Sequence, residues 1–510
     1  MHAILMGLET AATWQVLVAT GFGSLVGLIF GAIPGLTYSM ALAMVLPITF
    51  GMANEPAIAV MLSTYIGGMT GGAISAILIG VPGTPSAAAT VLDGHQMAKN
   101  GKASLAIGVA TVCAGVGGIL SLIVMLVAVK LLATVALAFG PAEITALVIF
   151  GLSTICGLAE KSLARGLIGG VLGLMVMTIG QDPIDGLPRF TFGSTTMLQG
   201  VDLLVAMIGL FAVPHAIAAL TAWKAGEEKR PEASAVKVEL PSFALLRSHW
   251  ANFLRSSVIG TVIGAIPGTG GPIAAFLSYD QARRFHKQPG RMGKGDLAGV
   301  IAPETANHAV TGGAMIPLLG LGIPGDPATA IILGGLLIHG IQPGPMLFME
   351  KPTVIANIYW LFLFAYVVVV IMQLYAVRLF VHALRIPPHM LAVGILVMCT
   401  VGSFAIRNSL FDVGVMMVIG FLGYLLLRVR IPVAPVLLGL VLGPTLERSA
   451  RTALIMSQGS LDIFYTSLPA LLFFGLAVLV IGSHVVGSLR AKAGAKANTP
   501  AASPATEQEA

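Results

Sequence analysis

Charged residues are scarce in this chain of 510 residues. They make up 10% of it, whereas hydrophobic residues make up 56%, and the mean hydropathy is +0.93. A soluble domain carries about 25% charged residues, so the composition predicts an all-α polytopic membrane protein embedded in the lipid bilayer. The net charge of +6 is explained by basic loops at the membrane surface, so it does not indicate binding to nucleic acid.

Cysteine and catalytic motifs are also lacking. The three cysteines, Cys113, Cys156 and Cys399, lie in apolar runs without a CxxC pair, which is typical of small buried residues. HExxH, a GxSxG at a strand–helix turn and a GxxxxGK[ST] phosphate loop are all absent from the sequence. The chain is therefore not expected to be an enzyme, to hydrolyse ATP or to need a cofactor. The basic region of a cleavable signal peptide is absent, so the first apolar run is expected to remain in the membrane.

The apolar runs predict about 12 or more membrane segments, because about 20 apolar residues suffice to cross a bilayer. A charged, proline-containing stretch at residues 224–249 divides them, and we interpret it as a cytoplasmic linker. This gives a first membrane repeat at residues 1–223 and a second at residues 250–489. Residues 490–510, rich in Ala, Lys, Thr and Pro, are expected to form a disordered tail.

The two hydrophobic halves repeat each other in order. Gly27, Gly31, Pro34 and Gly35 match Gly260, Gly264, Pro267 and Gly268; Thr70-Gly71-Gly72-Ala73 matches Thr311-Gly312-Gly313-Ala314; Pro82-Gly83-Thr84-Pro85 matches Pro324-Gly325-Asp326-Pro327; and Gly173 matches Gly420. The loop after the first Pro-Gly pair contains Glu55 and no Lys or Arg, while its counterpart contains Arg283, Arg284 and Lys287. Basic loops remain cytoplasmic, so equivalent loops lie on opposite sides and the repeats are predicted to be inverted.

Four Pro-Gly pairs interrupt the apolar runs: Pro34-Gly35, Pro82-Gly83, Pro267-Gly268 and Pro324-Gly325. Proline removes a backbone donor and glycine allows unusual dihedral angles, so each pair predicts a broken helix or a re-entrant hairpin. Unpaired backbone groups are tolerated inside a bilayer only within protein or beside a water-filled cavity. Paired interruptions in two halves indicate the binding site of a transporter.

A helix that begins after such a break directs its N–H groups and its positive dipole end into the break, which favours a carboxylate ligand. The substrate-binding candidates are Gly35, Leu36, Thr37, Gly83, Thr84, Ser86, Gly268, Thr269, Gly270, Gly325 and Asp326. The candidates for a coupling ion, Na⁺ or H⁺, are Pro34, Thr37, Pro267, Asn307 and Asp326. Structural roles are predicted for Pro82, Pro85, Pro324 and Glu304. Apart from a transported Na⁺, no metal is expected.

Several of these residues allow a simpler interpretation. Asp326 could be an exposed N-cap near the membrane interface, and Glu304 with Asn307 could cap a helix at the end of a loop. His308 and His339 are expected to be hydrogen-bonded structural groups. A single Pro-Gly pair can be a plain kink. Gly173, in the middle of a helix with no break beside it, is expected to tolerate alanine.

Several motifs together resemble one protein family. They are Gly31-Ala32-Ile33-Pro34-Gly35-Leu36-Thr37, Pro82-Gly83-Thr84-Pro85 with Asp93-Gly94, Ala302-Pro303-Glu304 with Ala306-Asn307, Gly322-Ile323-Pro324-Gly325, and His339-Gly340 with Pro343-Gly344-Pro345. The combination, over residues 14–488, resembles the large membrane subunit, of TctA type, of the bacterial tripartite tricarboxylate transporters.

The resemblance implies a multi-pass protein of the bacterial inner membrane. It implies secondary transport by symport, in which a cation drives the uptake of organic anions such as di- or tricarboxylates. It further implies two partners, a small membrane subunit and a periplasmic solute-binding protein that delivers the substrate. A passive anion channel is the alternative, followed by an integral membrane enzyme acting on lipid-linked substrates.

Overall fold

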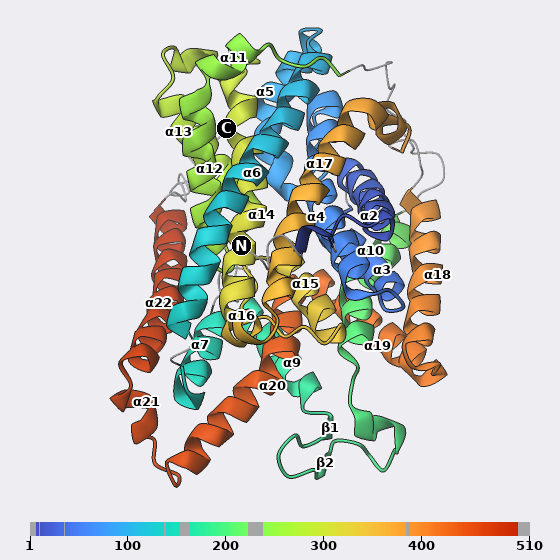
Figure 1. Ribbon diagram of the computed structural model, residues 1–510, viewed down its shortest axis with the longest axis vertical. Coiled ribbons are helices and arrows are strands. Elements are labelled where there is room, and N and C mark those ends of the chain that lie inside the picture. The colour runs from blue at the N-terminus through green and yellow to red at the C-terminus, as the bar shows by residue number, and fades with distance from the viewer. Residues whose placement is uncertain are drawn as a thin grey trace, which may run out of the picture.

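The computed structural model of the protein (Figure 1) describes residues 7–9, 11–34, 36–136, 139–153, 163–222, 238–383 and 388–497. Within these residues almost every element is a helix. The strands are two residues each, β1 (Gly180–Gln181) and β2 (Pro188–Arg189), and they pair antiparallel in one loop. The prediction of an all-α protein is therefore confirmed.

The described part of the first half contains the following elements in chain order: α2 (Trp14–Ala32), α3 (Tyr38–Thr49), α4 (Asn54–Ile79), η1 (Pro85–Ala87), α5 (Ala88–Lys99), α6 (Ala103–Ala136), α7 (Pro141–Ser153), α9 (Leu163–Met177), η2 (Thr196–Gln199) and α10 (Leu203–Ala222). The remainder contains α11 (Phe243–Ser248), α12 (Trp250–Ala265), α13 (Gly270–Arg284), η3 (Pro289–Arg291), α14 (Ala298–Leu321), α15 (Pro327–Ile338), α16 (Pro345–Glu350), α17 (Pro352–Ala383), α18 (Pro388–Arg407), α19 (Leu410–Arg428), α20 (Val433–Met456), α21 (Asp462–Thr466) and α22 (Leu468–Ala497).

Seven helices within the described ranges are long and apolar enough to cross a membrane: α2, α4, α6, α10, α17, α19 and α20. Shorter apolar helices of 10–17 residues stand at six further places. The protein is therefore a polytopic membrane protein, and the full number of spans stays a prediction. The predicted tail at residues 490–510 overlaps the end of α22, while residues 498–510, most of the linker and Cys156 lie outside the described residues.

The backbone repeats between the two halves at the helix breaks. α2 ends at Ile33 with φ −87° and ψ 116°, and α12 ends at Ile266 with φ −88° and ψ 110°. α4 ends at Gly80 with φ 71° and ψ 12°, and α14 ends at Gly322 with φ 73° and ψ 20°. The segments that match in sequence therefore also match in local conformation.

Small residues bring the paired helices of each half into backbone contact. A methyl group at Gly27 of α2 would overlap the carbonyl oxygen of Thr64 in α4, and one at Gly260 of α12 would overlap that of Ala306 in α14. Gly71 and Gly313 meet the partner helices in the same way, at Leu28 and Thr261. Close approach through small residues is a common way for membrane helices to associate, so Gly71 and Gly313 serve the close packing of these helices.

Two helices are exchanged between the halves. α10 of the first half packs against α18 and α19 of the second, while α20 of the second half packs against α7 and α9 of the first. The contacts again involve matching glycines: Gly420 of α19 faces Val213 of α10, and Gly173 of α9 faces the backbone of Val436 in α20. The expectation that Gly173 tolerates alanine is therefore wrong, because this glycine lies on a packed face.

We expect Gly173→Ala and Gly420→Ala to destabilise the protein, since a methyl group at either position overlaps the exchanged helix. Overpacking of this kind costs about 1–3 kcal/mol, and it should appear as a lower unfolding temperature in detergent. Gly414→Ala is the matched control, because it lies in α19 with open space around it. Equal unfolding temperatures for all three variants would contradict the close packing.

Candidate functional site

The two breaks of each half lie against each other. A methyl group at Gly83 would overlap the carbonyl oxygen of Gly31, next to the first break. In the second half the N–H of Gly268 donates to the carbonyl of Gly325 over 2.9 Å, and a methyl at Gly325 would lie 2.8 Å from the oxygen of Gly264. The four breaks thus form two backbone-to-backbone contacts of the same kind.

The second and third breaks meet across the two halves. A methyl group at Gly271, at the start of α13, would lie 2.8 Å from both Asn307 Oδ1 in α14 and Ser86 Cβ in η1. Ser86 and Asn307 are both fully buried. The N-terminus of α13 therefore faces a polar side chain from each half.

The fourth and first breaks meet through two tyrosines. Asp326, in the fourth break, accepts a hydrogen bond of 2.6 Å from the hydroxyl of Tyr65 in α4. The ring of Tyr65 lies 5.8 Å, centroid to centroid, from that of Tyr38, the first residue of α3 after the first break. Together these four contacts connect the breaks in a closed ring, called the break ring below.

Four helices begin at the break ring and leave it in two directions. In Figure 1, α5 and α13 occupy the upper part of the molecule, whereas α3 and α15 lie lower. The helices of each direction meet again away from the ring. Asp93 in the middle of α5 accepts from the N–H of Gly293, in the loop after η3, at 2.9 Å, and His339 after α15 contacts Thr49 of α3 at 3.4 Å. The predicted hydrogen-bonded role of His339 is confirmed.

The hydroxyl groups predicted at the breaks have different roles. Thr37 accepts from the N–H of Met40 at 3.2 Å and so caps α3. Thr269 donates to the carbonyls of Ile263 and Ile266 and so closes the end of α12. Thr84 and Ser86 are buried and bond each other at 3.2 Å. Of the predicted hydroxyls, Thr84 and Ser86 therefore have the most capacity for a ligand.

The glycines of the breaks are needed for two reasons. Gly268 has φ 83° and Gly270 has φ 69°, which strains any other residue. Gly83 and Gly325 are needed for close approach instead.

The other residues predicted at the breaks differ in burial. Leu36 and Pro324 are buried, Pro34, Pro82 and Pro267 are half-buried, and Pro85 is exposed. Gly35 lies outside the described residues.

Asp326 is an N-cap, and it is buried. Its Oδ1 accepts from the N–H of Thr329 at 2.7 Å, and the hydroxyl oxygen of Thr329 accepts from the N–H of Asp326 at 2.9 Å, which completes a capping box at the start of α15. Its side chain is only 2% exposed, so the interpretation as an exposed cap at the membrane interface is wrong. Within the described residues, no Lys or Arg forms an ion pair with this carboxyl group.

The buried middle of α14 contains Glu304 and, one turn later, the neighbouring residues Asn307 and His308. They cannot cap this helix, because it begins at Ala298, so the interpretation of Glu304 and Asn307 as a capping set is wrong. Glu304 accepts from the hydroxyl of Thr90 in α5. The ring nitrogens of His308 have no hydrogen-bond partner within the described residues, so the prediction of a hydrogen-bonded structural histidine is also wrong.

Three residues of this site were missed in the sequence: Tyr38, Tyr65 and Thr90. A lone hydroxyl in an apolar, glycine-rich run is a usable signal, since a buried hydroxyl normally has a polar partner. Tyr65 fits that signal. Thr90 carries no comparable signal, because its importance arises from Glu304 on a helix that is distant in sequence.

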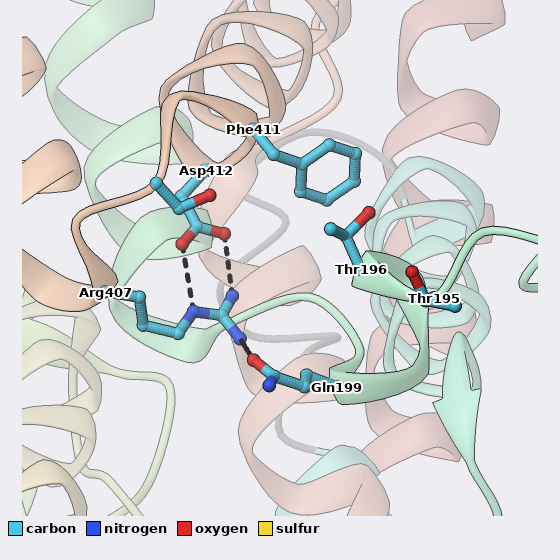
Figure 2. A pocket seen from close by; sticks show the side chains of 7 residues that line it. Thr195, Thr196, Gln199, Arg407, Phe411 and Asp412 are labelled. Atoms are coloured by element: carbon cyan, nitrogen blue, oxygen red, sulfur yellow. Dashed lines mark hydrogen bonds and ion pairs between the residues drawn. The ribbon is translucent and has the colours of Figure 1, made fainter.

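A separate polar cavity of about 210 Å³ lies between η2 and the start of α19. Figure 2 shows Arg407 bonded to both oxygens of Asp412, at 2.9 and 2.7 Å, and to Gln199 at 3.0 Å. Its lining includes none of the residues predicted from the sequence. The charge of Arg407 is already balanced by Asp412, so this cavity offers no obvious site for an anion.

Interrupted helices that meet at a buried, polar centre define the class of this molecule. In secondary transporters, half-helix ends and unwound backbone form the substrate and ion sites near the middle of the membrane. The break ring has this construction, with seven candidate membrane spans around it. The protein is a multi-pass membrane transport protein.

Comparison with known sequences defines the family. The chain belongs to the tripartite tricarboxylate transporter TctA family, whose sequence model matches residues 17–438. A 52.8 kDa protein from the TAR-I ttuC' 3' region of Agrobacterium vitis is 35% identical to it over 491 residues, 96% of each chain. A protein from the TAR-II ttuC' 3' region of the same organism is 38% identical over 233 residues, 46% of this chain and 96% of its own. No solved structure matches.

We expect Tyr65→Phe to lower the stability of the protein, because it leaves Oδ2 of the buried Asp326 without its donor. A hydrogen bond to a charged group contributes about 1.5–3 kcal/mol. Thermal unfolding in detergent measures the loss, with Tyr375→Phe as the control because Tyr375 is 84% exposed. If both variants unfold at the same temperature, the Tyr65–Asp326 bond does not hold the break ring together.

Proposed function

We propose that this protein is the membrane-embedded subunit of a cation-coupled secondary transporter that takes up organic anions, di- or tricarboxylates among them. It works in the bacterial inner membrane with a small membrane subunit and a periplasmic solute-binding protein that delivers the substrate. The observation that carries this proposal is the break ring, in which four helices begin at one buried place.

The chemistry of the ring favours an anionic substrate. The N-terminal turns of α3, α13 and α15 and of the η1–α5 segment direct backbone N–H groups toward the breaks, and such N-termini stabilise negative charge. The neighbouring hydroxyls of Thr84 and Ser86 can donate hydrogen bonds to a carboxylate. An anion therefore finds donors here without a buried Lys or Arg.

The same ring explains why a cation should accompany the substrate. Asp326 and Glu304 are buried, and a second anion placed near a buried carboxylate is strongly repelled in a medium of low dielectric constant. A bound Na⁺ or H⁺ removes that repulsion. Coupling then follows from electrostatics, since the substrate binds well only when the cation is present.

The arrangement of charges supports an inverted orientation of the repeats. The chain after α13 carries Lys287, Arg291 and Lys294, and basic loops remain in the cytoplasm. The end of the molecule at α5 and α13 is then cytoplasmic, and the end at α3 and α15 is periplasmic. Equivalent helices α3 and α13 thus run to opposite sides, as the sequence analysis predicts.

Uptake by the reconstituted complex tests the proposal. Proteoliposomes containing the protein and its two partners should accumulate a labelled di- or tricarboxylate only when an inward Na⁺ or H⁺ gradient is imposed. Saturation and counterflow should both be present, as in a carrier. Uptake that needs ATP, or that shows neither saturation nor counterflow, would overturn the proposal, and the second result would favour a passive channel.

Variants of the break ring test the site. We expect Gly83→Ala, Gly268→Ala and Gly325→Ala to abolish most uptake, because each methyl group enters a backbone contact or strains the chain by about 1–2 kcal/mol. Thr84→Ala and Asp326→Ala should raise the substrate or cation concentration needed for half-maximal uptake. Gly414→Ala serves as control, compared at equal amounts of protein in the membrane. Normal uptake by the glycine variants would show that the breaks are only kinks.

A further inference from the structure

α14 carries three polar side chains in its buried middle whose lack of hydrogen-bond partners the break ring does not explain. Glu304, Asn307 and His308 are each 0% exposed. Their positions in the sequence put Glu304 one turn before both of the others, so the three share one side of the helix. Polar groups at such depth are expensive and normally fully bonded.

These side chains lack partners to an unusual degree. Glu304 uses one oxygen to accept from the hydroxyl of Thr90, while Oε2 accepts from no group within the described residues. Both side-chain amide atoms of Asn307 and both ring nitrogens of His308 also have no hydrogen-bond partner within the described residues. The unused carboxylate oxygen lies 3.8 Å from His308 Nε2, which is an ion-pair distance and too long for a hydrogen bond.

Within the described residues, the helices around α14 supply no positive charge that could balance Glu304. Apart from Tyr366 of α17, the buried ionisable side chains described on the elements packed against α14 are Tyr65, Asp93, Cys113, Tyr279 and Asp326. Tyr65 bonds Asp326, and Tyr279 bonds Asp93 at 2.8 Å. Arg255 of α12, which is half-buried, bonds Asn252 and lies over the ring of Phe285. On α17, the ring of Tyr366 meets the edge of His308, and its hydroxyl bonds the backbone of His308.

We propose that Glu304 and His308 form a buried proton-binding site that holds one proton in exchange with water. Without it, the pair carries a negative charge in a site with no countercharge, which is unfavourable. With it, the pair is neutral, as a carboxylic acid beside an imidazole, because an imidazolium here would have no hydrogen-bond acceptor within the described residues. The role of this site in transport depends on the proposed function, whereas proton binding itself does not.

The site is connected to the break ring on two paths. Thr90, the donor to Glu304, lies four residues after Ser86, which reaches the start of α13 at Gly271. Asn307, one turn after Glu304, faces the same glycine. A change of charge at Glu304 alters how strongly it holds Thr90 and attracts the amide of Asn307. Both changes act where the second and third breaks meet, so the proton can alter the geometry that receives the substrate.

Infrared spectroscopy of the purified protein tests proton binding without any need for transport. A protonated carboxyl group gives a carbonyl band that shifts in heavy water and disappears as the pH rises. We expect Glu304→Gln to lose one such band, and His308→Gln to keep it at a changed midpoint pH. Glu350→Gln, on the exposed surface of α16, should leave it unchanged. A spectrum of Glu304→Gln identical to that of the wild type would overturn the proposal.

Transport assays then test the coupling. In the reconstituted complex, Glu304→Gln should lose accumulation driven by a proton gradient and keep substrate counterflow, because exchange does not require the proton to leave. Glu304→Asp, which keeps the carboxyl group, should restore part of the gradient response. Such a recovery would show that the loss in Glu304→Gln comes from the missing carboxyl group and not from misfolding. If Glu304→Gln still accumulates substrate with the proton gradient, or only its Na⁺ dependence changes, the assignment of a coupling proton is wrong.

Discussion

The structure depends on one constraint: backbone groups freed at a helix break inside a membrane must find partners there. The protein satisfies this constraint by pairing breaks with each other and with the helix ends around them. Gly268 donates to the carbonyl of Gly325, and Thr269 closes the end of α12 with its own hydroxyl. Glycine is required at these contacts because only an absent side chain allows backbones to approach so closely. The polar centre of the molecule is therefore made largely of main chain.

A centre built from main chain leaves its few ionisable side chains with little to balance them. Asp326 is held by Tyr65 and by a capping box, so its oxygens are well satisfied. Among the described residues, Glu304 accepts a side-chain hydrogen bond from Thr90 alone. The two carboxyl groups thus differ in bonding, and this difference separates a group that stabilises the fold from one that is free to change its charge.

Much of the fold and the positions of the helix breaks could be predicted from the sequence, for physical reasons. Proline and glycine act locally, so all four breaks were located, and repetition between halves distinguished them from single kinks. Side-chain partners depend on helices that are distant in the chain, so the sequence does not show that Tyr65 bonds Asp326 or that Thr90 bonds Glu304. The error at Gly173 has the same origin, because the sequence does not show that α20 covers that face of α9. His308 was assigned an ordinary structural role because its lack of partners is visible only in three dimensions.

The exchange of α10 and α20 has a consequence for the origin of the molecule. One helix of each half, α10 or α20, packs against helices of the other half, as exchanged segments do in a domain-swapped dimer. A half-length chain with this architecture would bury that helix only in a second copy of itself. Fusion of two such chains would turn a dimer that assembles according to concentration into a single molecule with its partner permanently attached. Each half of such a fused chain would then be free to acquire its own residues, and Asp326 indeed stands opposite Thr84.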